Sequence, residues 1–187
     1  MKLTFVNFLT LLRIAIIPVF VLTFYIPFDQ HYVVSAVLFL IAAITDWLDG
    51  FLARYWDQTS LLGAFLVPVA DKLMVATALV LLVSAYPYWW VSIPVVIVIC
   101  REITVSALRE LMADLGKRAS VKVSYIGKVK TTFQMISIFL LLLLTKSSYT
   151  WGISVGFVLL YGAAILTVYS MVLYLQAAYY EVKSQEN

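Results

Sequence analysis

Six long apolar segments, separated by short polar ones, dominate this sequence of 187 residues. A helix that crosses the ~30 Å hydrocarbon core of a bilayer needs about 20 mostly apolar residues. Segments of this kind lie at roughly 8–27, 33–53, 63–86, 89–112, 129–146 and 150–177. The pattern predicts an all-α integral membrane protein, a bundle of six transmembrane helices that forms a single domain over residues 1–187.

The composition supports a membrane environment. Hydrophobic residues make up 64% of the chain and charged residues 12%, against about 45–50% and about 25% in soluble domains. A soluble fold of this size could not bury so much apolar surface. The net charge of +3 is too small to indicate nucleic-acid binding. The apolar residues that precede the single cysteine, Cys100, predict a buried and unreactive thiol.

The distribution of basic residues predicts the orientation in the membrane. Six spans place both termini on the same side, and most basic residues lie toward that side: Lys2, Arg13, Arg54, Lys117, Arg118, Lys122, Lys128, Lys130 and Lys183. The loops on the opposite side hold only Lys146. Since cytoplasmic loops are enriched in Lys and Arg, we expect both termini to be cytoplasmic.

Charged residues interrupt the apolar segments: Asp46, Asp49, Asp71, Lys72, Arg101, Glu102 and Arg109. A charge within a span is costly and usually faces a polar cavity with a function. At ~1.5 Å per residue, Asp46, Asp71 and Arg101 all fall in the cytoplasmic half of the bilayer. We therefore expect a polar cavity open to the cytoplasm. The alternative is a set of structural ion pairs between helices.

The carboxylates follow helical spacing. One helix face carries Asp46, Asp49, Gly50 and Ala53, and the next helix carries Gly63, Val67 and Asp71 on one face. Clustered carboxylates without imidazole or thiolate favour Mg²⁺ or Mn²⁺. The only histidine, His31, lies in a loop on the other side of the membrane and cannot build a zinc site.

The stretch from Asp46 to Asp71 closely resembles the signature of the CDP-alcohol phosphotransferases, D-x2-D-G-x2-A-R-x8-G-x3-D-x3-D. Seven of its eight fixed positions match across 26 residues. The stretches 7–13, 101–110 and 126–131 are similar to the bacterial phosphatidylglycerophosphate synthases. The resemblance extends over nearly the whole chain.

This resemblance implies a reaction in phospholipid biosynthesis, the transfer of a phosphatidyl group from CDP-diacylglycerol to sn-glycerol 3-phosphate with release of CMP. It also implies a homodimer in the bacterial cytoplasmic (inner) membrane, among membrane lipids, with a two-metal active site facing the cytoplasm. The same chemistry with another acceptor stays open: phosphatidylglycerol, inositol phosphate or serine. A small transporter and a non-catalytic binding relative are further alternatives.

The resemblance also gives roles to individual residues. Asp46, Asp49 and Asp71 would be metal ligands, and Asp71 would also be the general base. The CDP group would meet Asn7, Thr10, Arg13, Gly50, Ala53 and Arg54. The acceptor phosphate needs cations, for which the candidates are Arg101, Arg109, Arg118 and Lys128.

Simpler structural roles compete with some of these functional ones. Asn7, Thr10 and Arg13 could cap or anchor the first helix, Arg54 could snorkel, and Asp71 could form a salt bridge. Lys117, Lys122 and Lys130 are expected to be attracted to anionic lipid or to set the orientation of the chain in the membrane. The motif Gly152-x-x-x-Gly156 could serve dimerisation or packing within the chain.

Val67 departs from the family signature, which has an aspartate at this position. That aspartate is a metal ligand in the family, whereas valine offers no donor atom. A two-metal site holds its ions ~3.5–4 Å apart despite their mutual repulsion. With one negative charge missing, we expect at least one ion to bind weakly and the chain to be impaired or inactive.

Overall fold

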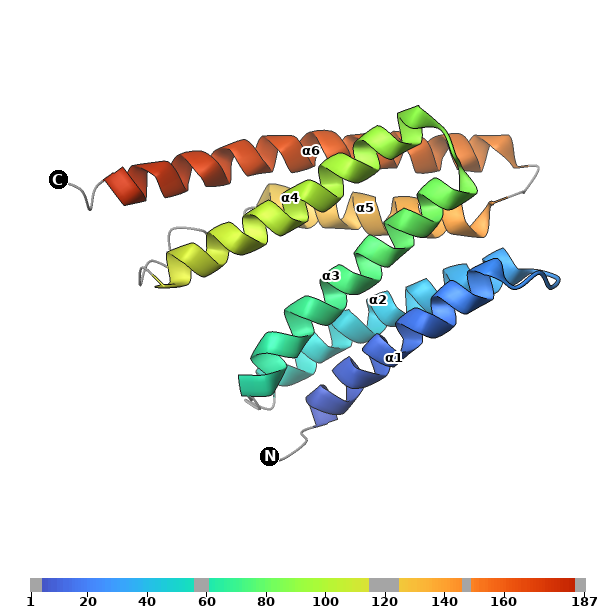
Figure 1. Ribbon diagram of the computed structural model, residues 1–187, viewed down its shortest axis with the longest axis horizontal. Helices are drawn as coiled ribbons and strands as arrows, with labels where there is room; N and C mark the ends of the chain where they lie inside the picture. Colours follow the sequence, from blue (N-terminus) through green and yellow to red (C-terminus); the bar gives the residue numbers. More distant parts are fainter. Residues whose placement is uncertain (1–4, 56–60, 115–124, 146–148, 184–187) are drawn as a thin grey trace. The chain divides into compact units, whose positions relative to one another are not determined.

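The computed structural model describes residues 5–55, 61–114, 125–145 and 149–183, with some side chains near these boundaries left out (Figure 1). The described residues form helices joined by short turns and contain no strand. The helices are α1 (Phe5–Tyr25), α2 (His31–Tyr55), α3 (Leu61–Ala85), α4 (Trp89–Asp114), α5 (Tyr125–Leu143) and α6 (Thr150–Lys183). Each predicted apolar segment corresponds to one of these helices, so the all-α prediction is confirmed for the described part.

Within the described residues, three of these helices are long and apolar enough to cross a membrane, through the runs Leu66–Ala85, Trp89–Ala113 and Thr150–Tyr179. The other three carry shorter apolar runs, Leu9–Tyr25, His31–Asp46 and Val129–Leu143. The chain is thus a multi-pass membrane protein.

The chain divides into two compact units, and unit 1 comprises Met1–Tyr86 with Ile138–Ser154. In unit 1, α1 packs against both α2 and α3 (Figure 1). Large apolar side chains such as Phe20, Phe39 and Leu82 are fully buried there. The packing of α1 matters for function because it brings one face of this helix against the acidic face of α2.

Unit 2 comprises Pro87–Ser137 with Val155–Asn187, and so contains α4, the first part of α5 and most of α6. The Tyr161 hydroxyl of α6 donates a 2.6 Å hydrogen bond to the carbonyl of Trp90. Farther along α4 and α6, Val105, Met112 and Tyr174 form a buried apolar cluster. These contacts place α4 and α6 side by side.

Both glycines of the Gly152-x-x-x-Gly156 motif pack within the chain. A Cβ on Gly152 would lie 2.5 Å from Cδ1 of Leu144. The carbonyl oxygen of Gly156 accepts a 2.7 Å hydrogen bond from the buried hydroxyl of Ser137. The small residues therefore let α6 approach its own chain closely, which supports the intrachain alternative.

The prediction for Cys100 was wrong, because its side chain is exposed. The apolar neighbours on which it rested indicate burial only in a soluble protein. In a membrane helix, an apolar residue faces either the protein core or lipid, and sequence neighbours do not distinguish the two.

Candidate active site

Unit 1 carries the acidic residues of the candidate site on two helices that pack together, α2 and α3. Asp46 lies on α2, and Asp71 lies on α3. Both side chains are only partly buried, as is Val67 one turn before Asp71. The side chains of the other predicted residues of this stretch lie outside the described residues: Asp49, Gly50, Ala53, Arg54 and Gly63.

Arg13 from α1 reaches the first of these carboxylates. Its Nη1 donates to Oδ1 of Asp46 at 2.5 Å. The Arg13 side chain is 1% exposed and that of Asp46 is 33% exposed. Thr10, one turn earlier on α1, is also buried. This burial argues against anchoring at the membrane surface for Thr10 and Arg13, whereas the Asn7 side chain lies outside the described part.

The donor atoms of this site suit a hard divalent cation. Carboxylate oxygens are the ligands that Mg²⁺ and Mn²⁺ prefer, and Asp46 and Asp71 provide them with access to solvent. Val67 offers no donor. Among the residues that the structure describes, no three His, Cys, Asp or Glu side chains form a metal-binding group. Asp49, the remaining predicted ligand, lies outside them.

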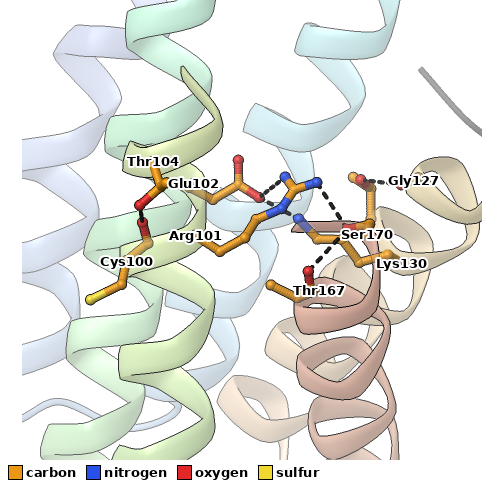
Figure 2. A network of polar contacts seen from close by, with 9 residues as sticks. Cys100, Arg101, Glu102, Thr104, Gly127, Lys130, Thr167 and Ser170 are labelled. Atoms are coloured by element: carbon orange, nitrogen blue, oxygen red, sulfur yellow. Dashed lines mark hydrogen bonds and ion pairs between the residues drawn. The ribbon is translucent and has the colours of Figure 1, made fainter. Parts of the chain in front are cut away.

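A second charged cluster lies in unit 2 and joins α4, α5 and α6 (Figure 2). Oε1 of Glu102 accepts hydrogen bonds from Nη1 of Arg101, at 3.2 Å, and from Nζ of Lys130. On its other side, Nη2 of Arg101 donates to the hydroxyl of Ser170 at 3.0 Å. Arg101, Lys130 and Ser170 are all buried. The cluster therefore brings two cations against one acid inside the helix packing.

Arg109 joins this cluster through an aromatic ring. The guanidinium carbons of Arg101 and Arg109 both lie 5.7 Å from the ring centroid of Tyr174 on α6. The structure thus brings together two of the four residues predicted for the acceptor phosphate. Arg118 and the side chain of Lys128, the other two, lie outside the described residues.

The prediction that Lys130 faces anionic lipid was wrong, because Lys130 is buried against Glu102. The sequence feature that could have predicted the burial of Lys130 is a row of polar residues on one face of α5. Lys130, Gln134 and Ser137 follow i, i+4, i+7 spacing, and all three are buried. Polar residues that repeat on one face of a membrane helix indicate a face that packs against protein.

The charges of the unit 2 cluster do not cancel. Among the described side chains, the buried Arg101 and Lys130 and the exposed Arg109 carry three positive charges, and the partly buried Glu102 carries one negative charge. A buried cation is costly unless an anion compensates it. The surplus makes this cluster suited to a ligand with a phosphate group, which guanidinium and ammonium groups bind well.

A family model covers most of the chain. The family model for CDP-alcohol phosphatidyltransferase matches residues 3–169. The matched region includes α1 to α5 and ends within α6, just before Ser170. The chain belongs to the CDP-alcohol phosphatidyltransferase family.

Individual relatives are similar over nearly their full length. The chain is 53% identical over 174 residues to a protein of Pectobacterium atrosepticum, covering 93% of this chain and 94% of that protein. It is 54% identical over 179 residues to a protein of Yersinia enterocolitica, covering 96% of this chain and 97% of that protein. It is 55% identical over 170 residues to a protein of Salmonella typhi, covering 91% of this chain and 92% of that protein. All three relatives are named CDP-diacylglycerol--glycerol-3-phosphate 3-phosphatidyltransferase.

Proposed function

We propose that this protein transfers the phosphatidyl group of CDP-diacylglycerol to sn-glycerol 3-phosphate, giving phosphatidylglycerophosphate and CMP in phospholipid biosynthesis. The relatives named above support the reaction. One observation of the structure supports an acceptor that carries a phosphate group, the surplus of cations around Glu102 and Tyr174 in unit 2. A phosphorylated acceptor matches this surplus, whereas serine brings no phosphate.

The reaction is a displacement at phosphorus. A hydroxyl oxygen of glycerol 3-phosphate forms a bond to the β-phosphorus of CDP-diacylglycerol, and the bond from that phosphorus to the bridging oxygen of CMP breaks. We propose that Asp71 accepts the hydroxyl proton, since it lies on α3 with partial access to solvent. CMP leaves with the electron pair of the broken bond.

We propose that Asp46, Asp49 and Asp71 hold Mg²⁺ or Mn²⁺. When bound, the metal supplies charge neutralisation on the pyrophosphate. The CDP group would lie against residues near the cytoplasmic ends of α1 and α2, with Asn7, Thr10, Arg13, Gly50, Ala53 and Arg54 as candidates. Arg13 supports Asp46 in this role, because its guanidinium binds the carboxylate and holds it in place.

We propose that α1–α6 all cross the membrane as one domain, with both termini and the active site on the cytoplasmic side of the bacterial inner membrane. The basic residues at the N-terminus and in the 115–124 connection support this orientation. In the cluster for the acceptor phosphate, Arg101 and Arg109 would act together with Arg118 and Lys128. A homodimer remains part of the proposal through the family resemblance.

Val67 leads to a specific expectation about activity. In the proposed metal site, this partly buried side chain adds neither charge nor donor atom. We therefore propose that the natural chain turns over slowly and that Val67→Asp raises its rate of CMP release.

The test is CMP release by the purified chain and by its Val67→Asp variant in detergent, with CDP-diacylglycerol and a panel of acceptors. We expect turnover with glycerol 3-phosphate and faster turnover in the variant. Turnover only with inositol phosphate or phosphatidylglycerol would overturn the acceptor. No CMP release by either protein with any acceptor and metal would count against the reaction itself.

A further inference from the structure

Glu102 lies at the centre of the unit 2 cluster, and the proposed reaction gives it no role. One of its oxygens, Oε1, accepts from a guanidinium on its own helix and from an ammonium on α5 (Figure 2). The Glu102 side chain is 30% exposed, against 7% for Arg101 and 3% for Lys130. Glu102 is therefore the most exposed of the three charged groups.

The bridge through Glu102 fixes two groups that would otherwise repel each other. Arg101 and Lys130 bind the same oxygen atom, so their charges are close neighbours in a poorly solvated place. Repulsion between like charges is strong where water does not screen it. Without the carboxylate, the flexible lysine side chain would move away from the guanidinium.

Ser170 holds Arg101 from the opposite side. Its hydroxyl donates to the carbonyl of Thr167 at 3.0 Å, within the same helix. Because the hydroxyl hydrogen is used there, a lone pair of Oγ is directed to Nη2 of Arg101. The guanidinium is thus held between a residue of α4 and a residue of α6.

The cluster has more donors than acceptors within the described part of the chain. Nε of Arg101 and the hydroxyl of Thr167 are both buried and have no hydrogen-bond partner there. Buried polar groups are normally satisfied, so these donors beside a surplus of positive charge fit an anionic ligand.

We propose that Glu102 is a positioning residue for the acceptor phosphate, one that keeps Arg101 and Lys130 together so that both can bind the same phosphate group. Arginine supplies a planar fork and lysine a point charge for such a ligand. Donors fixed in advance lose less conformational entropy on binding. This inference rests on the proposed function in one respect, that the acceptor carries a phosphate.

Direct binding tests the proposal without turnover. The full-length protein in detergent is titrated with glycerol 3-phosphate and, separately, with inorganic phosphate, in the absence of CDP-diacylglycerol. We expect Glu102→Gln to raise the Kd about tenfold, which corresponds to about 1.4 kcal/mol. Glu102→Asp keeps the charge and should restore binding to within about threefold of the natural protein.

Glu110→Gln is the matched control, because Glu110 is an exposed acid on the same helix. It removes the same charge and should change the Kd less than about twofold. An unchanged Kd in Glu102→Gln would overturn the proposal. So would equal losses in Glu102→Gln and Glu102→Asp, since a packing role does not depend on charge.

If Glu102→Gln does not fold, Ser170→Ala replaces it by removing the other contact that holds Arg101. We expect phosphate to bind about threefold more weakly to that variant, and unchanged binding would overturn the proposal. Natural protein that binds neither phosphate source would also overturn it. If the protein binds inorganic phosphate but releases no CMP with glycerol 3-phosphate, the proposed reaction is refuted. The proposal for Glu102 is then still tested, because the Kd for inorganic phosphate can be compared between the natural protein and the Glu102 variants.

Discussion

The ion pair between Arg13 and Asp46 gives the sharpest prediction on stability. The two groups differ strongly in their surroundings, since the guanidinium is 1% exposed and the carboxylate 33%. Removal of the acid by Asp46→Ala leaves a buried arginine that cannot lose its charge. We therefore expect Asp46→Ala to be strongly destabilising and Arg13→Met to rescue it.

The magnitude follows from the geometry. At 2.5 Å and an effective dielectric constant of about 20, the gross attraction is about 7 kcal/mol. Desolvation of the arginine offsets much of this, and removal of one partner of a buried pair typically costs about 3–5 kcal/mol. The partial hydration of Asp46 favours the lower end. At about 2–4 °C per kcal/mol for a chain of this size, Asp46→Ala should lower the Tm by roughly 6–12 °C.

The assay is thermal unfolding in detergent with a metal chelator present, so that any role of Asp46 in metal binding does not contribute. The natural protein, Asp46→Ala, Arg13→Met and the double variant form a double-mutant cycle. We expect the double variant to be more stable than Asp46→Ala alone, with a coupling of about 2 kcal/mol. If Asp46→Ala lowers the Tm equally in the natural and the Arg13→Met backgrounds, the buried charge is not the cause and the argument is refuted.

Three further predictions concern packing and metal binding. Gly152→Ala places a methyl group 2.5 Å from Cδ1 of Leu144, and because that side chain can shift, we expect a loss of about 1 kcal/mol, measured as a lower Tm. Ser137→Ala removes the 2.7 Å hydrogen bond to the Gly156 carbonyl and should lower the free energy of unfolding by about 0.6–1.7 kcal/mol, again measured as a lower Tm. An unchanged Tm would show that this hydrogen bond is not formed. Val67→Asp should tighten Mn²⁺ binding about tenfold or more, followed by paramagnetic resonance of the free ion, and equal affinity in both proteins would contradict our account of Val67.

The helices were predictable because a membrane imposes a simple rule on the sequence. A span must be about 20 residues long and apolar, so the predicted segment 89–112 and the observed α4, Trp89–Asp114, differ by only two residues. The charged positions within spans also indicated where to look. Asp46 and Arg101 are costly in lipid, and the structure gives each a partner inside the protein.

The choice of partners was not predictable from the same rule. Lys130 was expected to face anionic lipid because it belongs to the group of basic residues around the 115–124 connection. Whether such a lysine turns to lipid or to protein depends on the rotation of its helix, which the packing of α4 and α6 against α5 decides. The polar residues Gln134 and Ser137, which are buried on the same face of α5 as Lys130, are the sequence feature that indicates this rotation.

The pairing of Arg13 with Asp46 was likewise not predictable. Sequence spacing relates residues within one helix, whereas these two lie 33 positions apart on different helices. Both residues were expected near the same ligand through family resemblance, and neither was expected to bind the other. Only the packing of α1 on α2 brings the two side chains together.

The contributions of α4, α5 and α6 to one charged cluster have a consequence for biosynthesis. Arg101 and Glu102 are translated about 70 residues before Ser170. While the final helix is still in the ribosome, the nascent protein already holds a guanidinium and an ammonium in the membrane without their last contact. A chain truncated before residue 167 would therefore lack the hydrogen bond from Arg101 to Ser170. A membrane protease could distinguish unfinished from complete molecules by this exposed charge.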